Sequence, residues 1–213
     1  MILDINIETG SRTASSIANA EFIHCDVANK TAIDTSVESI IGRHGQIDVC
    51  VNNAGILRDE TFHKGSEANW DLVIKVHLKG TYCCTKPVFE WMRANGGGTI
   101  VNTSSTSGLL GNFGQSNYGA AKAGFTAFLS GLRNRLAGQG VHVVTVKPGF
   151  VATRMTENMD LPEKLTAAPA EVGQAVLKAV EKRQDVIYVR AVWRMIMGII
   201  RLIPERVFKK LKI

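Results

Sequence analysis

The stretch "VHVVTVKPGF", residues 141–150, decides the fold, because it is a near-continuous apolar run that Pro148 and Gly149 bring to an end. Strict alternation of apolar and polar residues would indicate a strand with one face in water, whereas an unbroken run indicates a strand buried on both faces. Such strands belong to parallel sheets that helices cover on both sides. The run therefore predicts an inner strand of an α/β protein.

Further short runs of this kind lie on both sides of it, separated by longer segments typical of helices. The other predicted strands are "MILDINI", "EFIHCDV", "IDVCVNNAG", "GTIVNTSS" and "DVIYVR". Helices are predicted over 67–91, with a bend or division near Gly80, and over 116–136 and 169–182. This alternation predicts a doubly wound, Rossmann-like and mostly parallel sheet with helices on both faces, over residues 1–190. A basic amphipathic extension is predicted over 191–213.

Composition narrows the class of protein. The 213 residues are 45% hydrophobic and 21% charged, which is typical of one soluble globular domain. The body of the chain lacks a basic face with interleaved aromatic residues, so no nucleic-acid partner is predicted. The start has no signal-peptide pattern and no run reaches the roughly 18 apolar residues of a spanning helix, so the default location is cytoplasmic. The four cysteines match no metal motif and are interpreted as buried thiols of a reducing compartment.

Polar residues gather at the predicted carboxyl ends of the strands. They are Asp4, Asp26, Asn53, Ser105 and the pair Pro148-Gly149. In doubly wound sheets ligands bind beyond these ends, so the pattern predicts one binding site at one edge of the sheet.

Ser105, Tyr118 and Lys122 form the candidate catalytic group. Tyr118 and Lys122 are four apart on a predicted helix and so share one face. A nearby ammonium group favours the phenolate and lowers a tyrosine pKa from about 10 toward the working range. A serine hydroxyl at the neighbouring strand end can hydrogen-bond a substrate oxygen. The alternative is an ordinary surface pair, which the spacing alone would favour.

The order of the motifs resembles that of the short-chain dehydrogenase/reductase family. "VNNAG", a strand ending in Ser-Ser, Ser105 thirteen residues before Tyr118, "YGAAKAG" and "KPGFVATRM" follow one another as in that family, and the likeness spans about residues 2–190. The resemblance implies an oxidoreductase that interconverts a secondary alcohol and a ketone by hydride transfer. It makes Tyr118 the general acid/base, Ser105 the group that orients the substrate oxygen, and Lys122 the group that lowers the tyrosine pKa and holds the nicotinamide ribose.

The resemblance also implies which residues line a nicotinamide cofactor. The adenosine side would be Asn53, Ala54 and Gly55, with Asp26 and Val27 near the adenine. Pro148, Gly149, Val151 and Thr153 would cover the nicotinamide, and Tyr118 and Lys122 would contact the cofactor as well. Gly55 would let the backbone approach a flat ligand. Asn52 is predicted instead to tie neighbouring strands together. For Asp26, a turn or helix-capping role remains open.

Asp4 indicates the choice of cofactor. A carboxylate at this strand end accepts hydrogen bonds from both ribose hydroxyls and repels a 2′-phosphate. No Arg or Lys follows directly after Asp4 to bind such a phosphate. The sequence therefore favours NAD over NADP.

The chain departs from the family pattern at its start. A dinucleotide-binding unit normally opens with a strand, a Gly-rich turn and a helix, whose backbone N–H groups hold the pyrophosphate. No such turn occurs in the printed sequence, which by the family's order begins at the second strand. The missing strand would be central, so a gap in the sheet is predicted. Three explanations stay open: a truncated chain, a cofactor-free relative that acts as a binding or scaffold protein, or a sheet position that the opening segment or a partner chain fills.

His77, in "VIKVHLKG", is the second departure, since the family usually has Asn there to position a water in the proton relay. A histidine can hold a water too, but it is expected to titrate near neutrality. A half-buried helix histidine is the alternative. "NNAGILRD", "VHLKG" and "GNFGQSNY" are similar to hydroxyacyl-CoA dehydrogenase units of multifunctional enzymes and, less closely, to 3-oxoacyl carrier-protein reductases. The sequence thus leans toward acyl thioesters or other lipid-like substrates.

The last residues form the extension. Between 190 and 213 there are seven basic residues and one acid, Glu205. Arg190, Arg194 and Arg201 are predicted to share one helical face, with apolar residues around them. A broad apolar face with basic edges is typical of a helix at a membrane surface; packing on the body or on a sister subunit is the alternative. The resemblance further implies a homodimer or homotetramer.

Overall fold

The computed structural model describes residues 1–58, 60–109 and 115–211. Its strands are β1 (Ile2–Asp4), β2 (Phe22–His24), β3 (Val49–Asn52), β4 (Gly98–Thr103), β5 (Val141–Pro148), β6 (Phe150–Val151), β7 (Thr166–Ala167) and β8 (Val186–Val189). Its α-helices are α1 (Ile7–Ser15), α2 (Lys30–His44), α3 (Glu67–Ile74), α4 (Thr81–Ala94), α5 (Ser116–Leu136), α6 (Pro169–Glu181), α7 (Val192–Ile200) and α8 (Glu205–Phe208). All six predicted strands and the predicted helices over 116–136 and 169–182 are confirmed.

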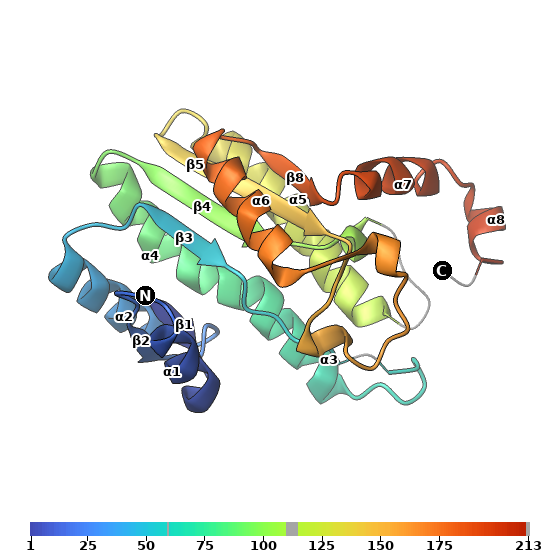
Figure 1. The fold of residues 1–213 in the computed structure, drawn as a ribbon, viewed down its shortest axis with the longest axis horizontal. Helices are drawn as coiled ribbons and strands as arrows, with labels where there is room; N and C mark the ends of the chain where they lie inside the picture. The colour runs from blue at the N-terminus through green and yellow to red at the C-terminus, as the bar shows by residue number, and fades with distance from the viewer. Residues whose placement is uncertain (59, 110–114, 212–213) are drawn as a thin grey trace.

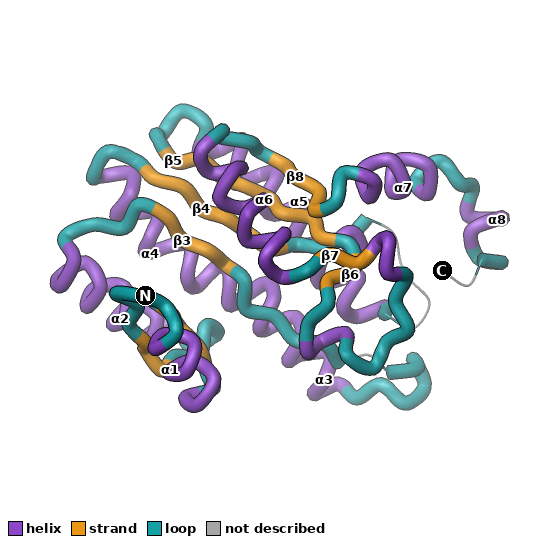
Figure 2. The backbone as a smooth tube through the Cα atoms, viewed as in Figure 1, coloured by secondary structure: helices purple, strands orange, loops and turns teal. Residues whose placement is uncertain are grey.

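The main sheet has four parallel strands in the order β3-β4-β5-β8. Helices α4 and α5 lie on one face and α6 on the other, as Figure 1 shows, so the predicted doubly wound architecture is confirmed. Strand β5 is buried along its whole length, as its apolar run predicts. A separate two-stranded pair, β6 and β7, lies beyond the carboxyl end of β5 (Figure 2).

The predicted gap in the sheet is present. Strands β1 and β2 form a parallel pair of their own, and neither pairs with the main sheet. The amide of Ile2 donates to Glu21 and the carbonyl of Asp4 accepts from Cys25, so the polar groups of Leu3 face the other edge of β1. A cavity of about 900 Å³ lies between β1 and β3 and is lined by residues of both strands. One strand position is therefore open.

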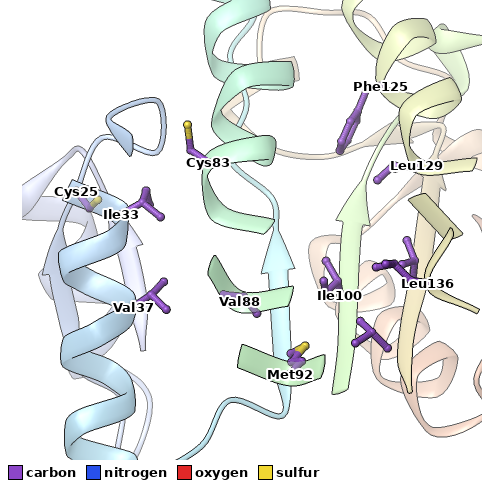
Figure 3. Packing of buried hydrophobic residues seen from close by; sticks show 12 residues of the cluster. Cys25, Ile33, Val37, Cys83, Val88, Met92, Ile100, Phe125, Leu129 and Leu136 are labelled. Carbon is purple, nitrogen blue, oxygen red and sulfur yellow. The ribbon is translucent and has the colours of Figure 1, made fainter. Parts of the chain in front are cut away.

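Helix packing joins the β1–β2 pair to the body in place of strand pairing. Ile33 and Val37 of α2 belong to the same buried cluster as Cys83 and Val88 of α4 (Figure 3). The cluster continues along the same face of the sheet to α5, with Met92, Ile100, Phe125 and Leu129. The hydrophobic core thus spans the gap on one face of the sheet.

The helix predicted over 67–91 is divided, as expected. A π-helical segment, η1 (Lys75–Gly80), separates α3 from α4. A Cβ atom on Gly80 would lie 2.9 Å from Cγ2 of Val27, so glycine allows the close approach of this segment to the residues after β2. Short π-helical segments inside longer helices frequently occur at functional sites, and this one carries His77.

The prediction for Arg190 is wrong. Helix α7 begins at Val192, so Arg190 does not share a helical face with Arg194 and Arg201. Arg190 has a positive φ of 56° and pairs with Glu171, with 3.1 Å between Nη2 and Oε1. Its role is to attach the segment before α7 to α6. No helix in the described ranges is long and apolar enough to cross a membrane.

Candidate active site

Lys122 lies inside the protein, on the second turn of α5. Its side chain is only 4% exposed, and Nζ donates a hydrogen bond to the carbonyl oxygen of Thr103, at 2.8 Å. Nζ also lies 5.7 Å from the centre of the Tyr118 ring and 5.5 Å from that of Phe125. Burial lowers the pKa of Lys122 to about 8. The surface-pair interpretation of Tyr118 and Lys122 is therefore excluded.

Ser105 follows β4 and caps the short helix η2 (Thr106–Gly108), with its Oγ accepting from the amide of Ser107 at 3.1 Å. This turn is fastened to α5 at two points. The Oγ of Ser104 hydrogen-bonds Oγ1 of Thr126, at 2.8 Å. A Cβ on Gly108 would lie 2.6 Å from the carbonyl carbon of Lys122. The contact brings the Ser105 turn against the part of α5 that carries Tyr118 and Lys122.

His77 faces Tyr118 from the π-helical segment. The two rings meet edge to face, 5.4 Å between centroids and 84° between planes. The Nε2 atom lies 2.8 Å from the carbonyl oxygen of Ile56 and 3.2 Å from its amide nitrogen, so it bonds the backbone of Ile56 as a donor in one tautomer and as an acceptor in the other. Among the described residues, the buried Nδ1 of the ring has no hydrogen-bond partner.

The expectation that His77 titrates near neutrality is wrong. The side chain is 2% exposed, and burial, followed by the charge of Lys122, lowers its pKa to about 4, against a smaller opposite effect of the bond to Ile56. The imidazole is therefore neutral at pH 7 and acts as a dipole and an acceptor. A half-buried helix histidine is excluded as well, because the ring is fully inside.

Gly55 is required by His77. A Cβ atom on Gly55 would lie 2.7 Å from Cε1 of the His77 ring, closer than any side chain tolerates. Glycine at position 55 was expected to allow the close approach of a flat ligand. The structure shows a second reason for it, which is the room that the His77 ring needs. Asn117, at the start of α5, donates to the carbonyl of Arg58 at 3.0 Å and holds the same loop from the other side.

Six of the predicted cofactor residues line the cavity between β1 and β3. They are Asp4, Asp26, Val27, Asn53, Ala54 and Gly55. Asp4 and Asp26 each use one carboxylate oxygen to accept from the backbone amide two residues on, at 2.8 and 2.9 Å. Of the open alternatives for Asp26, the structure shows the turn role, while Asn29 caps α2. The second oxygen of Asp26 lies 3.9 Å from Nζ of Lys75.

The other six predicted cofactor residues do not line that cavity: Tyr118 and Lys122 lie on α5, and four lie at or after the end of β5. Pro148 ends β5, Val151 pairs with Ala167 in the β6–β7 pair, and the amide of Thr153 donates to Oγ1 of Thr156 at 3.1 Å. Gly149 lies directly against α7: a Cβ there would be 2.0 Å from Cε2 of Trp193. The segment after β5 is thus supported from behind by Trp193.

Some site-building residues were missed by sequence reasoning. Asn102 lies fully buried in β4 and accepts from Nδ2 of Asn52, at 2.9 Å, while its own Nδ2 donates to the carbonyls of Ile100 and Val144. Asn52 also donates to Oγ1 of Thr85, so its predicted structural role is confirmed. A polar residue inside the apolar run "GTIVNTSS" is the signal that could have identified Asn102.

A second, smaller cavity of about 390 Å³ lies beside the loop that follows β3. It is lined by Ile56, Leu57, Arg58, Arg154 and Met155. Two guanidinium groups at one apolar hollow could bind an anionic part of a ligand. Within the described chain, no group of three or more His, Cys, Asp or Glu side chains could hold a metal ion.

Comparison with known families identifies the class of protein to which the chain belongs. The short chain dehydrogenase family matches residues 1–164, so the chain belongs to that family. The likeness anticipated over about residues 2–190 is therefore confirmed for most of its length.

Its relatives carry related names. The chain is 39% identical over 175 residues to an acetoacetyl-CoA reductase of Acinetobacter sp., covering 78% of this chain and 71% of that protein. It is 40% identical over 162 residues to the 3-oxoacyl-[acyl-carrier-protein] reductase FabG of Thermotoga maritima, covering 71% and 66%. It is 44% identical over 154 residues to the peroxisomal multifunctional enzyme type 2 of Mus musculus, covering 70% and 19%. The aligned region spans only 58% of an acetoacetyl-CoA reductase from Cupriavidus necator.

Solved structures show the same fold. A short-chain dehydrogenase from Streptomyces avermitilis superposes with a TM-score of 0.80 at 24% identity, covering 92% of this chain and 80% of that one. ElxO, solved with NADP bound, gives a TM-score of 0.79 at 21% identity, covering 88% and 85%. The cofactors of the family are NAD and NADP, and these comparisons leave the choice between them open.

Proposed function

We propose that this chain carries the proton-transfer site of an NAD-dependent oxidoreductase that interconverts a secondary alcohol and a ketone. The observation that supports it most is the buried Lys122, whose ammonium group lies 5.7 Å from the ring of Tyr118 and pairs with no carboxylate among the described residues. A buried cation of this kind favours the charged form of a neighbouring phenol.

In the proposed mechanism, Ser105 hydrogen-bonds the substrate oxygen and Tyr118 gives or takes the proton on it. Lys122 stabilises the phenolate of Tyr118, and Nδ1 of the neutral His77 hydrogen-bonds a water that relays protons. NAD would supply the hydride chemistry when bound, since its oxidised form accepts a hydride and its reduced form donates one. The chain's own residues thus hold the substrate oxygen and move the proton.

The residues present fit two ends of NAD. Asp4 would accept hydrogen bonds from the adenosine ribose, with Asp26, Val27, Asn53, Ala54 and Gly55 around the adenosine and Lys122 on the nicotinamide ribose. Pro148, Gly149, Val151 and Thr153 would cover the nicotinamide. No residue of the printed sequence forms the Gly-rich turn that would hold the pyrophosphate. Binding of NAD by this chain alone is therefore proposed to be weak.

For the substrate we propose a β-oxo or β-hydroxy acyl thioester. Arg58 and Arg154, which line the 390 Å³ cavity, suit the phosphate groups of a thioester carrier, and Met155 and Ile56 suit its apolar chain. The names of the Acinetobacter and Thermotoga relatives support this class.

Turnover tests the proposal. With acetoacetyl-CoA and NADH, the chain should oxidise NADH, and the Y118F variant should lose about a hundredfold or more of that rate. The matched control is Y82F, because Tyr82 is an exposed tyrosine of α4. Equal rates for the wild type and Y118F would contradict the assignment of Tyr118.

A non-catalytic, cofactor-free binding or scaffold protein on the same fold is the second candidate. The open strand position between β1 and β3 and the lack of a Gly-rich turn favour it. Isothermal titration with NAD separates the two: no binding favours the scaffold, whereas saturable binding by the bare chain, weak or micromolar, would exclude it.

We also propose that the chain self-associates, as a dimer or tetramer, through α4 and α5. Both helices present an exposed aromatic side chain, Tyr82 at 48% and Phe128 at 37% exposure, and such residues are enriched in interfaces. All four cysteines are free thiols, which supports a reducing compartment such as the cytoplasm. Size-exclusion chromatography with light scattering tests the assembly.

A further inference from the structure

Helix α7 has one face that is fixed to the body. Trp193 and Met197, four residues apart, are 7% and 6% exposed. The indole Nε1 donates to the carbonyl of Leu165 at 3.0 Å, and the ring meets Phe150 edge to face with centroids 5.1 Å apart. These contacts fix the orientation of α7. The fold therefore also determines which side chains the opposite face of the helix exposes.

The opposite face of α7 is apolar and uncovered. Met195, Ile199 and Leu202 are 63%, 59% and 83% exposed. Met195 and Ile199, four residues apart, lie on one side of the helix, and Leu202 lies in the turn that follows α7. Figure 2 shows α7 and α8 extending beyond the sheet, with α8 at the outer end. We call Met195, Ile199 and Leu202 the outer face.

Basic residues border the outer face. Arg194 and Arg201 are seven residues apart and so lie on one edge of α7. After Pro204 follow Arg206, Lys209 and Lys210, all exposed. Apart from Glu205 there is no acid between 190 and 213, and none of these five cations forms an ion pair among the described residues.

Among the described residues, no acidic side chain of the body pairs with these cations. Arg201 instead lies near enough to Lys147 for its charge to act on that buried lysine, whose pKa is lowered first by burial and then by Arg201 and Arg133. Positive charge therefore accumulates where α7 leaves the sheet. A negatively charged partner from outside the chain would stabilise it.

We propose that the outer face of α7 and the basic residues beside it dock the protein on an anionic lipid surface. Apolar side chains that enter the acyl boundary and cations that bind headgroups are the two contributions such docking requires. A second copy of the chain fits less well, because pairing two outer faces would bring two sets of unpaired cations together. This inference goes beyond the proposed oxidoreductase and does not depend on it.

The attachment of α7 to the body determines where the docking surface lies relative to the proposed active site. Trp193 packs on Gly149, in the segment after β5 that we propose covers the nicotinamide. A lipid surface under α7 would therefore lie beside the substrate end of the sheet.

Co-sedimentation of the full chain with vesicles tests the proposal. Phosphatidylcholine vesicles that contain phosphatidylglycerol should pull the protein down, and vesicles of phosphatidylcholine alone should do so much less. The triple variant M195S/I199S/L202S and the double variant R194E/R201E should each bind at least about tenfold more weakly.

Matched controls use α6, where Leu177 is 61% exposed and Lys178 is exposed as well. The variants L177S and K178E/K182E should bind as the wild type does, and circular dichroism checks that all variants are folded. No binding by the wild type, or unchanged binding by both α7 variants, would overturn the proposal. So would a dimer that M195S/I199S/L202S dissociates while vesicle binding stays the same.

Discussion

The ring of His77 stands edge-on to the ring of Tyr118, with 5.4 Å between centroids, and its Nδ1 is buried without a partner among the described residues. The same ring covers Gly55 and reaches the backbone of Ile56. One side chain of the π-helical segment thus joins the proposed acid/base to the loop after β3. Its protonation would disturb both.

The free energy of unfolding should depend on pH through the protonation of His77. Its pKa is about 4 in the folded protein against 6.5 for the free side chain, so the unfolded chain binds the proton more readily. The contribution is therefore fully present above pH 6.5 and is lost as the pH falls toward 4, amounting to about 3 kcal/mol. Urea unfolding of the wild type and H77N at pH 7 and pH 4.5 measures it. The wild type should lose more stability than H77N, and equal losses would contradict the buried, neutral imidazole. H24N is the matched control, because His24 is exposed.

Lys122 should be costly for stability and necessary for activity. Because burial lowers its pKa from 10.5 to about 8, the folded protein at pH 7 holds a charge that it disfavours. The variant K122M should raise the free energy of unfolding at pH 7 by about 1–3 kcal/mol, with part of the gain cancelled by the unpaired carbonyl of Thr103. The gain should shrink between pH 8 and 10.5, where the wild-type lysine loses its proton on folding.

Chemical denaturation at pH 7 and pH 10 checks this prediction, and the turnover assay with acetoacetyl-CoA follows the same variant. A K122M protein that is less stable than the wild type at pH 7 would show that the bond from Nζ to Thr103 outweighs the cost of burial. K178M, on exposed Lys178, is the control for a general effect of removing a lysine.

Local sequence patterns were sufficient to predict most of the fold, because the periodicity of strands and helices depends on residues that are close in the sequence. The continuous run of β5 and the helix over 116–136 were predicted with their bounds, and the lack of a first strand predicted the gap beside β3. The environment of His77 could not be predicted, because its burial depends on Ile56, Lys122 and Tyr118, which only the fold brings together. Arg190 was misassigned since helical spacing was extended past a residue that has a positive φ.

The open edge of β3 should make the chain prone to associate. Val49 and Val51 are 42% and 52% exposed, and β3 pairs with a neighbour only on the β4 side. Unpaired edges of this kind recruit strands from other chains, and a lysine on the edge opposes such pairing. The variant V51K should therefore aggregate more slowly than the wild type in static light scattering at raised temperature. L177K, on the exposed side of α6, should not differ from the wild type, and equal slowing by both variants would attribute the effect to net charge alone.

Gly149 and Trp193 should be coupled in stability. A Cβ on Gly149 would lie 2.0 Å from the indole ring, which the bond to Leu165 and the contact with Phe150 hold in place. The variant G149A should therefore lose about 2–4 kcal/mol of unfolding free energy, and W193L a similar amount through lost packing. In the double variant the smaller leucine leaves room for the new methyl group, so the combined loss should fall short of the sum by about 1–3 kcal/mol. A matched pair, G173A with W193L, should be additive, because a Cβ on Gly173 meets no atom within 4 Å. Additivity of G149A with W193L would mean that α7 does not rest on the strand end, and would separate the C-terminal helix from the proposed nicotinamide side of the site.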